Sequence, residues 1–403
     1  MTPHQIGRRT LLLWGFYTVL LAICLSSWLP LITGGLASFQ TVAWDFLNLY
    51  TGARLVLAGR GPLLYNLDEQ MRLQTALITP RTVASGGLPF YYPPTILPFL
   101  LPFCLGSLRT GYFAWLVLNL LLVAGFLFLL QRHLRLQAPH GFTSILAVLS
   151  FYPLSIHLMQ GQTALLVLLG LTLAYVLLQR GHDFRAGLVL ALGSIKPPLL
   201  LPLSLVLLCK GRWRALTGLF TGTLLLLLPM VPVLGATGLQ GYAQLVFAST
   251  ALHGKYGIFP ESMHNWWAFS FRLLGGGTAA LLLCAGLTLA SLGALLWAWH
   301  GRWQPAGTRF PLQYAATILL TPMLSPHLYL HDLVLWLLAA ILIAYASPVL
   351  QEHRCRWLWY GLLLSGSAIP FWLILDPGPG GPLTLLPAVA TTIALLVRLR
   401  RSQ

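Results

Sequence analysis

The sequence predicts an all-α, polytopic integral membrane protein that crosses the bilayer about twelve times. Of its 403 residues, 57% are hydrophobic and only 8% are charged, against about 25% charged residues in an average soluble domain. Apolar runs of about 20 residues, the length that a helical crossing needs, recur from Leu11 to Val397. These runs lack the period-two alternation of barrel strands, so helices are the predicted elements.

The net charge of +16 indicates membrane topology and not nucleic-acid binding. The 24 Lys and Arg residues are mostly spread in twos and threes between apolar runs, which is typical of cytoplasmic connections and not of a phosphate-binding face. The five cysteines form no CxxC pair, so no metal or redox site is predicted from them. Arg8 and Arg9 precede the first apolar run, whose length favours a retained helix over a cleaved signal peptide.

The basic clusters also predict how the helices pair. If the clusters from Arg8/Arg9 to the carboxyl end all lie on the cytoplasmic side, the chain forms a single transmembrane domain over residues 1–403, in the inner (plasma) membrane, with both termini cytoplasmic. The predicted pairs are 11–33 with 110–131, 141–159 with 162–179, two short crossings within 186–209, 215–235 with 277–300, 310–323 with 331–347, and 357–375 with 382–398.

Two segments depart from regular spans. Residues 186–209 must hold two crossings of about 12 residues each around the Lys-Pro-Pro turn at 196–198, which predicts a thin, recessed outer face. Residues 92–108 contain four prolines and are predicted as a juxtamembrane helix in the outer interface. If 92–108 spans instead, the crossings number about thirteen unless the 186–209 hairpin is one helix, and the sidedness of 109–196 inverts.

Two connections on the outer side are long: residues 34–109 form the first external loop, with juxtamembrane helices, and residues 236–276 form the second. This topology brings a set of polar residues to the outer face, although it was derived from the basic clusters alone. The set comprises Asp45, Gln162, Lys196, His264, His327 and Asp332. The outer face is therefore the predicted position of a functional site.

Asp45 and Lys196 are the strongest candidates for chemistry. Asp45 follows the first helix, and a partly desolvated carboxylate there can act as a general base toward a hydroxyl; the alternative is a helix N-cap for residues 46–58. Lys196 interrupts an apolar run, and a lysine at membrane depth is usually functional. Its ammonium could hold a lipid phosphate, or it could extend to the nearest interface.

His327 and His331 lie between two apolar helices, in TPMLSPHLYLHD. Their four-residue spacing would place them on one helical face, where they could bind a metal, orient a diphosphate or sugar, or simply cap a helix. No third ligand is obvious, so no metal site is predicted. Arg54 and other outer arginines would suit an anionic headgroup. The aromatic residues of YYPP (91–94) and NWW (265–267) are interfacial anchors or sugar-stacking platforms.

Five segments carry a family resemblance over about 290 residues, in a characteristic order: WDFLNLYTGARLVLAGRGPLLYN (44–66), YYPPTILPFLLPF (91–103), GQTALLVLLGL (161–171), AGLVLALGSIKPP (186–198) and SPHLYLHDLVLW (325–336). Together they resemble the polyprenol-phosphate-mannose-dependent α-mannosyltransferases of glycosyltransferase family 87, within the GT-C superfamily. The resemblance implies a GT-C fold and catalysis by Asp45. It also implies that Lys196 and His327 hold the lipid phosphate of the donor, and Tyr92 and Gln162 match further elements of the family that could bind the donor phosphate or sugar. In the second external loop only the HNWW character matches, which gives His264, Trp266 and Trp267 as candidates for acceptor or sugar binding. The basic outer face adds Arg54 to the donor side, and the four-residue spacing from His327 adds His331 to the acceptor or sugar side.

The resulting hypothesis is an inverting glycosyltransferase without a cofactor. Its partners would be a polyprenyl-phosphate-sugar donor, a glycolipid or glycan acceptor, and the lipid bilayer. A transporter or flippase of a lipid-linked or polar solute is the main alternative, but it predicts ionisable residues near mid-membrane and related halves. A ligase that moves a whole glycan is a second alternative, which would usually need a longer, arginine-rich external loop.

Overall fold

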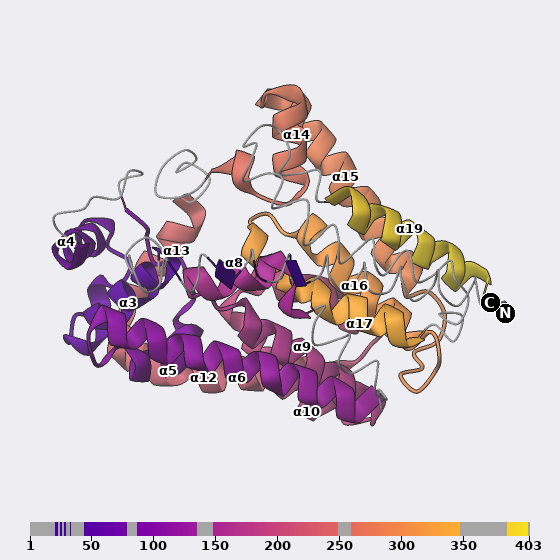
Figure 1. Ribbon diagram of the computed structural model, residues 1–403, viewed down its shortest axis with the longest axis horizontal. Helices are drawn as coiled ribbons and strands as arrows, with labels where there is room; N and C mark the ends of the chain where they lie inside the picture. Colours follow the sequence, from indigo (N-terminus) through magenta and orange to yellow (C-terminus); the bar gives the residue numbers. More distant parts are fainter. Residues whose placement is uncertain are drawn as a thin grey trace.

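The computed structural model describes residues 44–78, 87–134, 148–248, 259–346 and 385–401, and six positions between 21 and 33. All regular structure in these residues is helical (Figure 1). The predicted helix 357–375 lies outside the described residues, as does most of the predicted helix 11–33. The predicted all-α class is therefore observed in the described part of the chain, and the number of crossings stays a prediction.

The segment predicted as the first external loop contains α3 (Trp44–Leu57), a short turn η1 (Gly61–Leu63) and the amphipathic helix α4 (Leu67–Ile78). Arg60 pairs with Glu69 and so joins the residues after α3 to α4, whereas the pair between Arg72 and Glu69 lies within α4. The segment predicted as a juxtamembrane helix follows as three short turns, η2 (Pro94–Ile96), α5 (Leu97–Leu100) and η3 (Leu101–Cys104). Together they form one helical stretch, Pro94–Cys104, and its prolines, which lack amide donors, explain why it changes between α and 3-10 geometry.

Among the described residues, three helical stretches are long and apolar enough to cross a membrane. They are α6 (Leu108–Leu134), the continuous stretch Trp213–Ala248, and α15 (Gly277–Ala298). The second stretch consists of α12 (Trp213–Leu227), η5 (Leu228–Met230) and α13 (Val231–Ala248), with a kink at Gly235, whose φ is 60°. The predicted helix end at residue 235 coincides with the non-helical backbone of Gly235, and helical residues follow it in the predicted second external loop.

Shorter helices alternate with tight breaks in the middle of the chain. The helices α8 (Tyr152–Gln160) and α9 (Ala164–Gln179) meet at Gly161, whose left-handed φ of 70° ends α8. The next segment contains α10 (Asp183–Leu190), η4 (Ala191–Ile195) and α11 (Pro197–Cys209), and it breaks at Lys196. This break lies where the sequence predicts a turn, because two consecutive prolines cannot continue the preceding helix.

The carboxyl-terminal half supplies η7 (Pro260–Ser262), α14 (Trp266–Leu274), α16 (Phe310–Leu324), η8 (Leu330–Leu335), α17 (Trp336–Ala346) and α19 (Leu385–Arg401). Figure 1 shows α16 and α17 in the middle of the helices, with α14 and one end of α15 projecting from them. The side chains of Tyr175, Tyr314 and Trp336 are fully buried where α9, α16 and α17 meet. These inner helices position the segments that line the cavity described next.

Candidate active site

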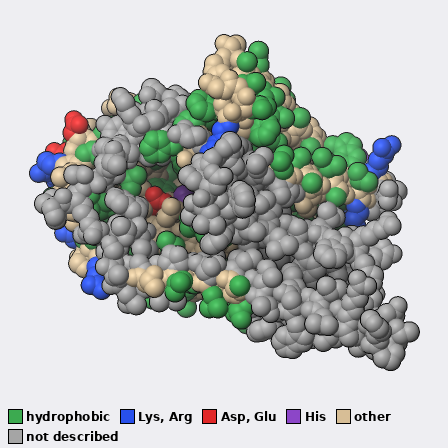
Figure 2. Space-filling model, turned by 45° about the horizontal axis from the view of Figure 1, so that its top comes forward, with side chains coloured by type: hydrophobic (Ala, Val, Ile, Leu, Met, Phe, Trp, Pro, Cys, Tyr) green, Lys and Arg blue, Asp and Glu red, His purple; other side chains and the backbone are tan. Residues whose placement is uncertain are grey.

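A cavity of about 410 Å³ opens beside the first turn of α3. Figure 2 shows a hollow in this protein with acidic and histidine side chains at its floor. The cavity is lined by five separate segments: the start of α3, residues 88–93, the α8–α9 turn, the break around Lys196, and residues 326–332, with Tyr242 and Val246 from α13. Residues far apart in the sequence therefore line one cavity. Its polar side chains are bordered by apolar surface from proline and leucine residues.

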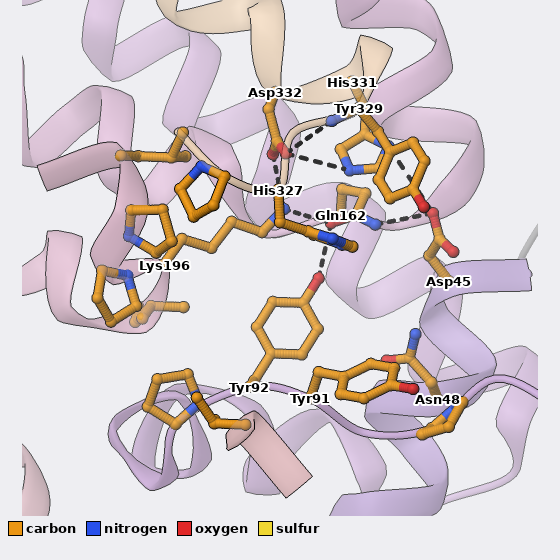
Figure 3. Close-up of a pocket in the computed structure, with 18 of the residues that line it drawn as sticks. Asp45, Asn48, Tyr91, Tyr92, Gln162, Lys196, His327, Tyr329, His331 and Asp332 are labelled. Carbon is orange, nitrogen blue, oxygen red and sulfur yellow. Dashed lines mark hydrogen bonds and ion pairs between the residues drawn. The ribbon is translucent and has the colours of Figure 1, made fainter. Parts of the chain in front are cut away.

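Gln162 connects the two strongest candidates inside this cavity (Figure 3). Its Nε2 donates a hydrogen bond of 2.7 Å to Asp45 Oδ2. Its Oε1 accepts hydrogen bonds from the Tyr92 hydroxyl at 2.7 Å and from Lys196 Nζ at 3.0 Å. Since the Lys196 ammonium can only donate, Gln162 must present its amide oxygen to Lys196 and its NH₂ group to the carboxylate. Asp45 and Lys196 are thus held on opposite sides of one oriented side chain.

Burial raises the pKa of the Asp45 carboxyl above its usual 3.8, although the hydrogen bond from Gln162 and the charge of Lys196 oppose the shift. Desolvation disfavours the charged carboxylate, so proton binding becomes easier. A carboxylate with a raised pKa in a cavity is a stronger base than an exposed one, which suits it to remove a proton from a hydroxyl.

Lys196 makes a second contact that the sequence did not predict. Its Nζ donates to Asp332 Oδ1 at 2.6 Å, and the two side chains are only 14% and 5% exposed. The ammonium also lies 5.6 Å from the centre of the Tyr92 ring. Asp332 is placed by η8, since its carboxylate faces the backbone N–H of Tyr329 at the start of that turn. A buried ammonium is therefore held by one charged and two neutral partners.

The two predicted histidines both line the cavity. His331 Nδ1 lies 2.8 Å from Gln160 Oε1 and 3.9 Å from Asp45 Oδ2, while its Nε2 lies 3.6 Å from Asp332 Oδ2. The His327 ring packs edge-on against Tyr329. Within the described ranges, no group of three His, Cys, Asp or Glu side chains is arranged to hold a metal ion.

Four predicted site residues lie elsewhere. The guanidinium of Arg54 approaches the carbonyl oxygens of Cys104 and Leu105, and neither it nor His264, Trp266 or Trp267 lines the cavity. The Trp266 indole N–H donates to Ser291 Oγ on α15.

The motif that contains Trp266 and Trp267 still supports the cavity, through Asn265. The Asn265 side chain caps α14 by accepting from the Ala268 N–H. Its Nδ2 donates to the carbonyl oxygens of Ser325 and Pro326, immediately before His327. Asn265 therefore holds in place the loop that carries His327.

Asp332, Asn48, Tyr91 and Tyr329 line the cavity but were not assigned to the site from the sequence. Asn48 could have been assigned to the site from the sequence, because it follows Asp45 by three residues and residues at that spacing on a helix share a face. Asp332 belonged to the polar set at the predicted outer face, but its pairing with Lys196 could not be predicted because the two positions are 136 residues apart.

Fold and site together define a helical membrane protein with a buried, ionisable cavity at the breaks between short helices. Comparison with protein families gives the class of chemistry, because residues 90–326 match glycosyltransferase family 87. The match covers more than half of the chain, so the protein belongs to glycosyltransferase family 87, which confirms the resemblance found in the sequence. Tyr92, Gln162 and Lys196 lie in the matched region, and Asp45 precedes it. No curated protein and no solved structure matches the chain.

Proposed function

We propose that this glycosyltransferase moves one sugar, mannose, from a polyprenyl-phosphate donor to a hydroxyl of a lipid-linked or cell-envelope glycan, with inversion at the anomeric carbon. The donor and the sugar are those that the family resemblance implies. The observation that carries the proposal is the shared cavity, in which Asp45 and Lys196 are bridged by Gln162. This geometry supports the proposal because the carboxylate and the ammonium line the same cavity, about 410 Å³ in volume.

In this mechanism Asp45 takes the proton from the acceptor hydroxyl, whose oxygen attacks the anomeric carbon. The bond between that carbon and the phosphate oxygen breaks on the opposite face, and polyprenyl phosphate leaves with the electron pair. Because phosphate is a good leaving group, no general acid is required. The apolar surroundings exclude water, which favours transfer over hydrolysis.

Lys196 holds the phosphate of the donor in this proposal. An ammonium has three N–H donors, and two of them point at Asp332 and Gln162. The third is available for a phosphate oxygen, with His327 on the same side of the cavity (Figure 3). Apolar residues beside Lys196, among them Ile195 and Leu199, suit the first isoprene units.

Asp45→Asn tests the role of the base. The amide cannot accept the proton, so transfer of radiolabelled mannose from polyprenyl-phosphate-mannose should fall by about 10²–10⁴-fold. Binding of polyprenyl phosphate by the purified variant should persist, because Lys196 is unchanged. Asp68→Asn is the matched control, since Asp68 is an exposed carboxylate on α4. Retention of most of the transfer activity by Asp45→Asn would remove Asp45 from this role.

The proposed site faces away from the cytoplasm, with both termini inside. Single cysteines at positions 45 and 196, introduced into a cysteine-free protein, should react with a membrane-impermeant thiol reagent from the same, outer compartment. A cysteine at position 403 should react only after the membrane is opened. Labelling of positions 45 and 196 from opposite compartments would contradict the proposed reaction.

A further inference from the structure

Asn48 is a buried polar residue of the cavity to which the reaction above gives no task. It lies on α3, three residues after Asp45, and its side chain is in the cavity lining. Only 8% of the residue is exposed. Its Oδ1 is fully buried and has no hydrogen-bond partner in the part of the chain that the structure describes. An amide oxygen in this position has lost its water without gaining a donor.

An unsatisfied buried acceptor is costly, and such groups in proteins usually have a partner in the functional state. Figure 3 shows the Asn48 amide next to Asp45, across the cavity from Lys196, with Tyr91 beside it. A carbonyl oxygen can only accept a hydrogen bond. The missing partner is therefore a donor, and a phosphate or carboxylate on the ligand would not supply one.

The direction of the reaction decides which substrate supplies this donor. In an in-line displacement, the attacking and leaving oxygens lie on opposite sides of the anomeric carbon. Lys196 marks the side of the leaving phosphate and Asp45 the side of the attacking hydroxyl. Asn48 shares a helical face with Asp45, so its amide faces the acceptor.

We propose that Asn48 Oδ1 accepts a hydrogen bond from a second hydroxyl of the acceptor, and that the Asp45–Asn48 face of α3 is the acceptor subsite. This inference rests on the proposed function and deepens it. The subsite selects a polyhydroxylated acceptor, a sugar unit, over a lipid alcohol with a single hydroxyl. Asn48 is a specificity-determining residue, and Asp45 alone exchanges the proton.

The experiment measures kcat/KM for mannose transfer to octyl α-mannopyranoside and to its monodeoxy analogues. Asn48→Ala should lower kcat/KM by about 10-fold for the parent acceptor, the size expected for one lost hydrogen bond. It should cause no loss for one of the analogues, the one that lacks the hydroxyl held by Asn48. Asn48→Leu, which keeps the volume but not the carbonyl, should give the same pattern.

Thr51→Val is the matched control, since Thr51 lies one turn further along α3, donates its hydroxyl to the Leu47 carbonyl and does not line the cavity. It should keep the wild-type ranking of the acceptors. Equal losses for every analogue with both Asn48 variants, or no loss for any, would overturn the proposal. A failure of the proposed function itself looks different, since the wild-type protein would then consume no polyprenyl-phosphate-mannose with any acceptor.

Discussion

The long helices and the short helices of this protein differ in how much of their apolar surface is buried. In α6, in the stretch Trp213–Ala248 and in α15, at most a third of the most apolar window is buried inside the protein. Large apolar side chains such as Phe128, Phe220 and Leu282 project outward. In α9, α16 and α17, by contrast, almost every side chain is buried. The long helices thus present surface suited to lipid, and the short ones form the interior.

This difference explains where the polar cavity can exist. Irregular backbone is tolerated at membrane depth only where protein surrounds it or water fills a cavity. The short inner helices leave such breaks at Gly161, at Lys196 and in η8, and each break contributes a polar side chain to the cavity. The long outer helices surround the inner ones, and the breaks in the inner helices supply the polar side chains of the cavity.

The largest expected effect separates two lysines, one in the cavity and one at the edge of the helices. Lys196→Ala should lower mannose transfer by at least about 10²-fold, because the phosphate loses its cation. It should also destabilise the protein by about 3–5 kcal/mol, because Asp332 becomes a buried, unpaired charge. Lys210→Ala removes only a hydrogen bond to the exposed Gly301 carbonyl and should leave both quantities near wild type.

Transfer rates and thermal unfolding in detergent give the two measurements for these variants. Equal effects of the two substitutions would show that the position of Lys196 in the cavity gives it no greater role in transfer or stability than Lys210 has.

A pH profile compares two carboxylates in different surroundings. Burial raises the pKa of Asp45, whereas hydrogen bonds from Arg60 and Arg72 lower the pKa of the partly exposed Glu69 below 4.5. A general base acts only when deprotonated, so kcat/KM should rise with pH and level off above the Asp45 pKa, with a midpoint above 3.8. Below the midpoint the rate should fall about tenfold per pH unit.

Glu69→Gln should leave this profile in place, because Glu69 does not line the cavity. A midpoint at or below that of an ordinary aspartate would show that the cavity does not desolvate Asp45 in the working enzyme.

The smallest effect compares a glycine between packed helices with one on an outer helix. A methyl group at Gly187 of α10 would collide with the Ala215 carbonyl of α12, whereas one at Gly125 of α6 would meet nothing within 4 Å. Gly187→Ala should therefore destabilise the protein by about 1–3 kcal/mol. Gly125→Ala should be neutral or stabilising by up to about 1 kcal/mol.

Thermal unfolding midpoints in detergent test both variants. A similar loss in the two would mean that α6 is packed as tightly at Gly125 as α10 is against α12.

Much of the architecture could be predicted from local patterns. The break at Lys196 follows from two prolines and the turn at Gly161 from a glycine. The predicted juxtamembrane helix within 92–108 is present as a series of α and 3-10 turns. The predicted helix end at residue 235 coincides with the non-helical backbone of Gly235, although helical residues follow on its far side. Predictions for 357–375 lie outside the described residues.

For the candidate site, the sequence predicts some of the residues but not the contacts between them. Asp45, Gln162 and Lys196 could be proposed from the sequence, since polar residues in so apolar a chain are few and conspicuous. The partners could not be proposed, because Lys196 meets Asp332 and Tyr92 meets Gln162 only when five distant segments pack around one space. Arg54 and Trp266 show the converse, since both look suited to a ligand in the sequence and lie outside the cavity in the structure.

The sequence by itself determined the helical membrane class, the main breaks and the family, because hydrophobic length, proline and short motifs act locally. Only the tertiary structure decided which polar groups share the cavity and which amide oxygen in it lacks a donor. Those properties depend on distances between segments that no local pattern encodes.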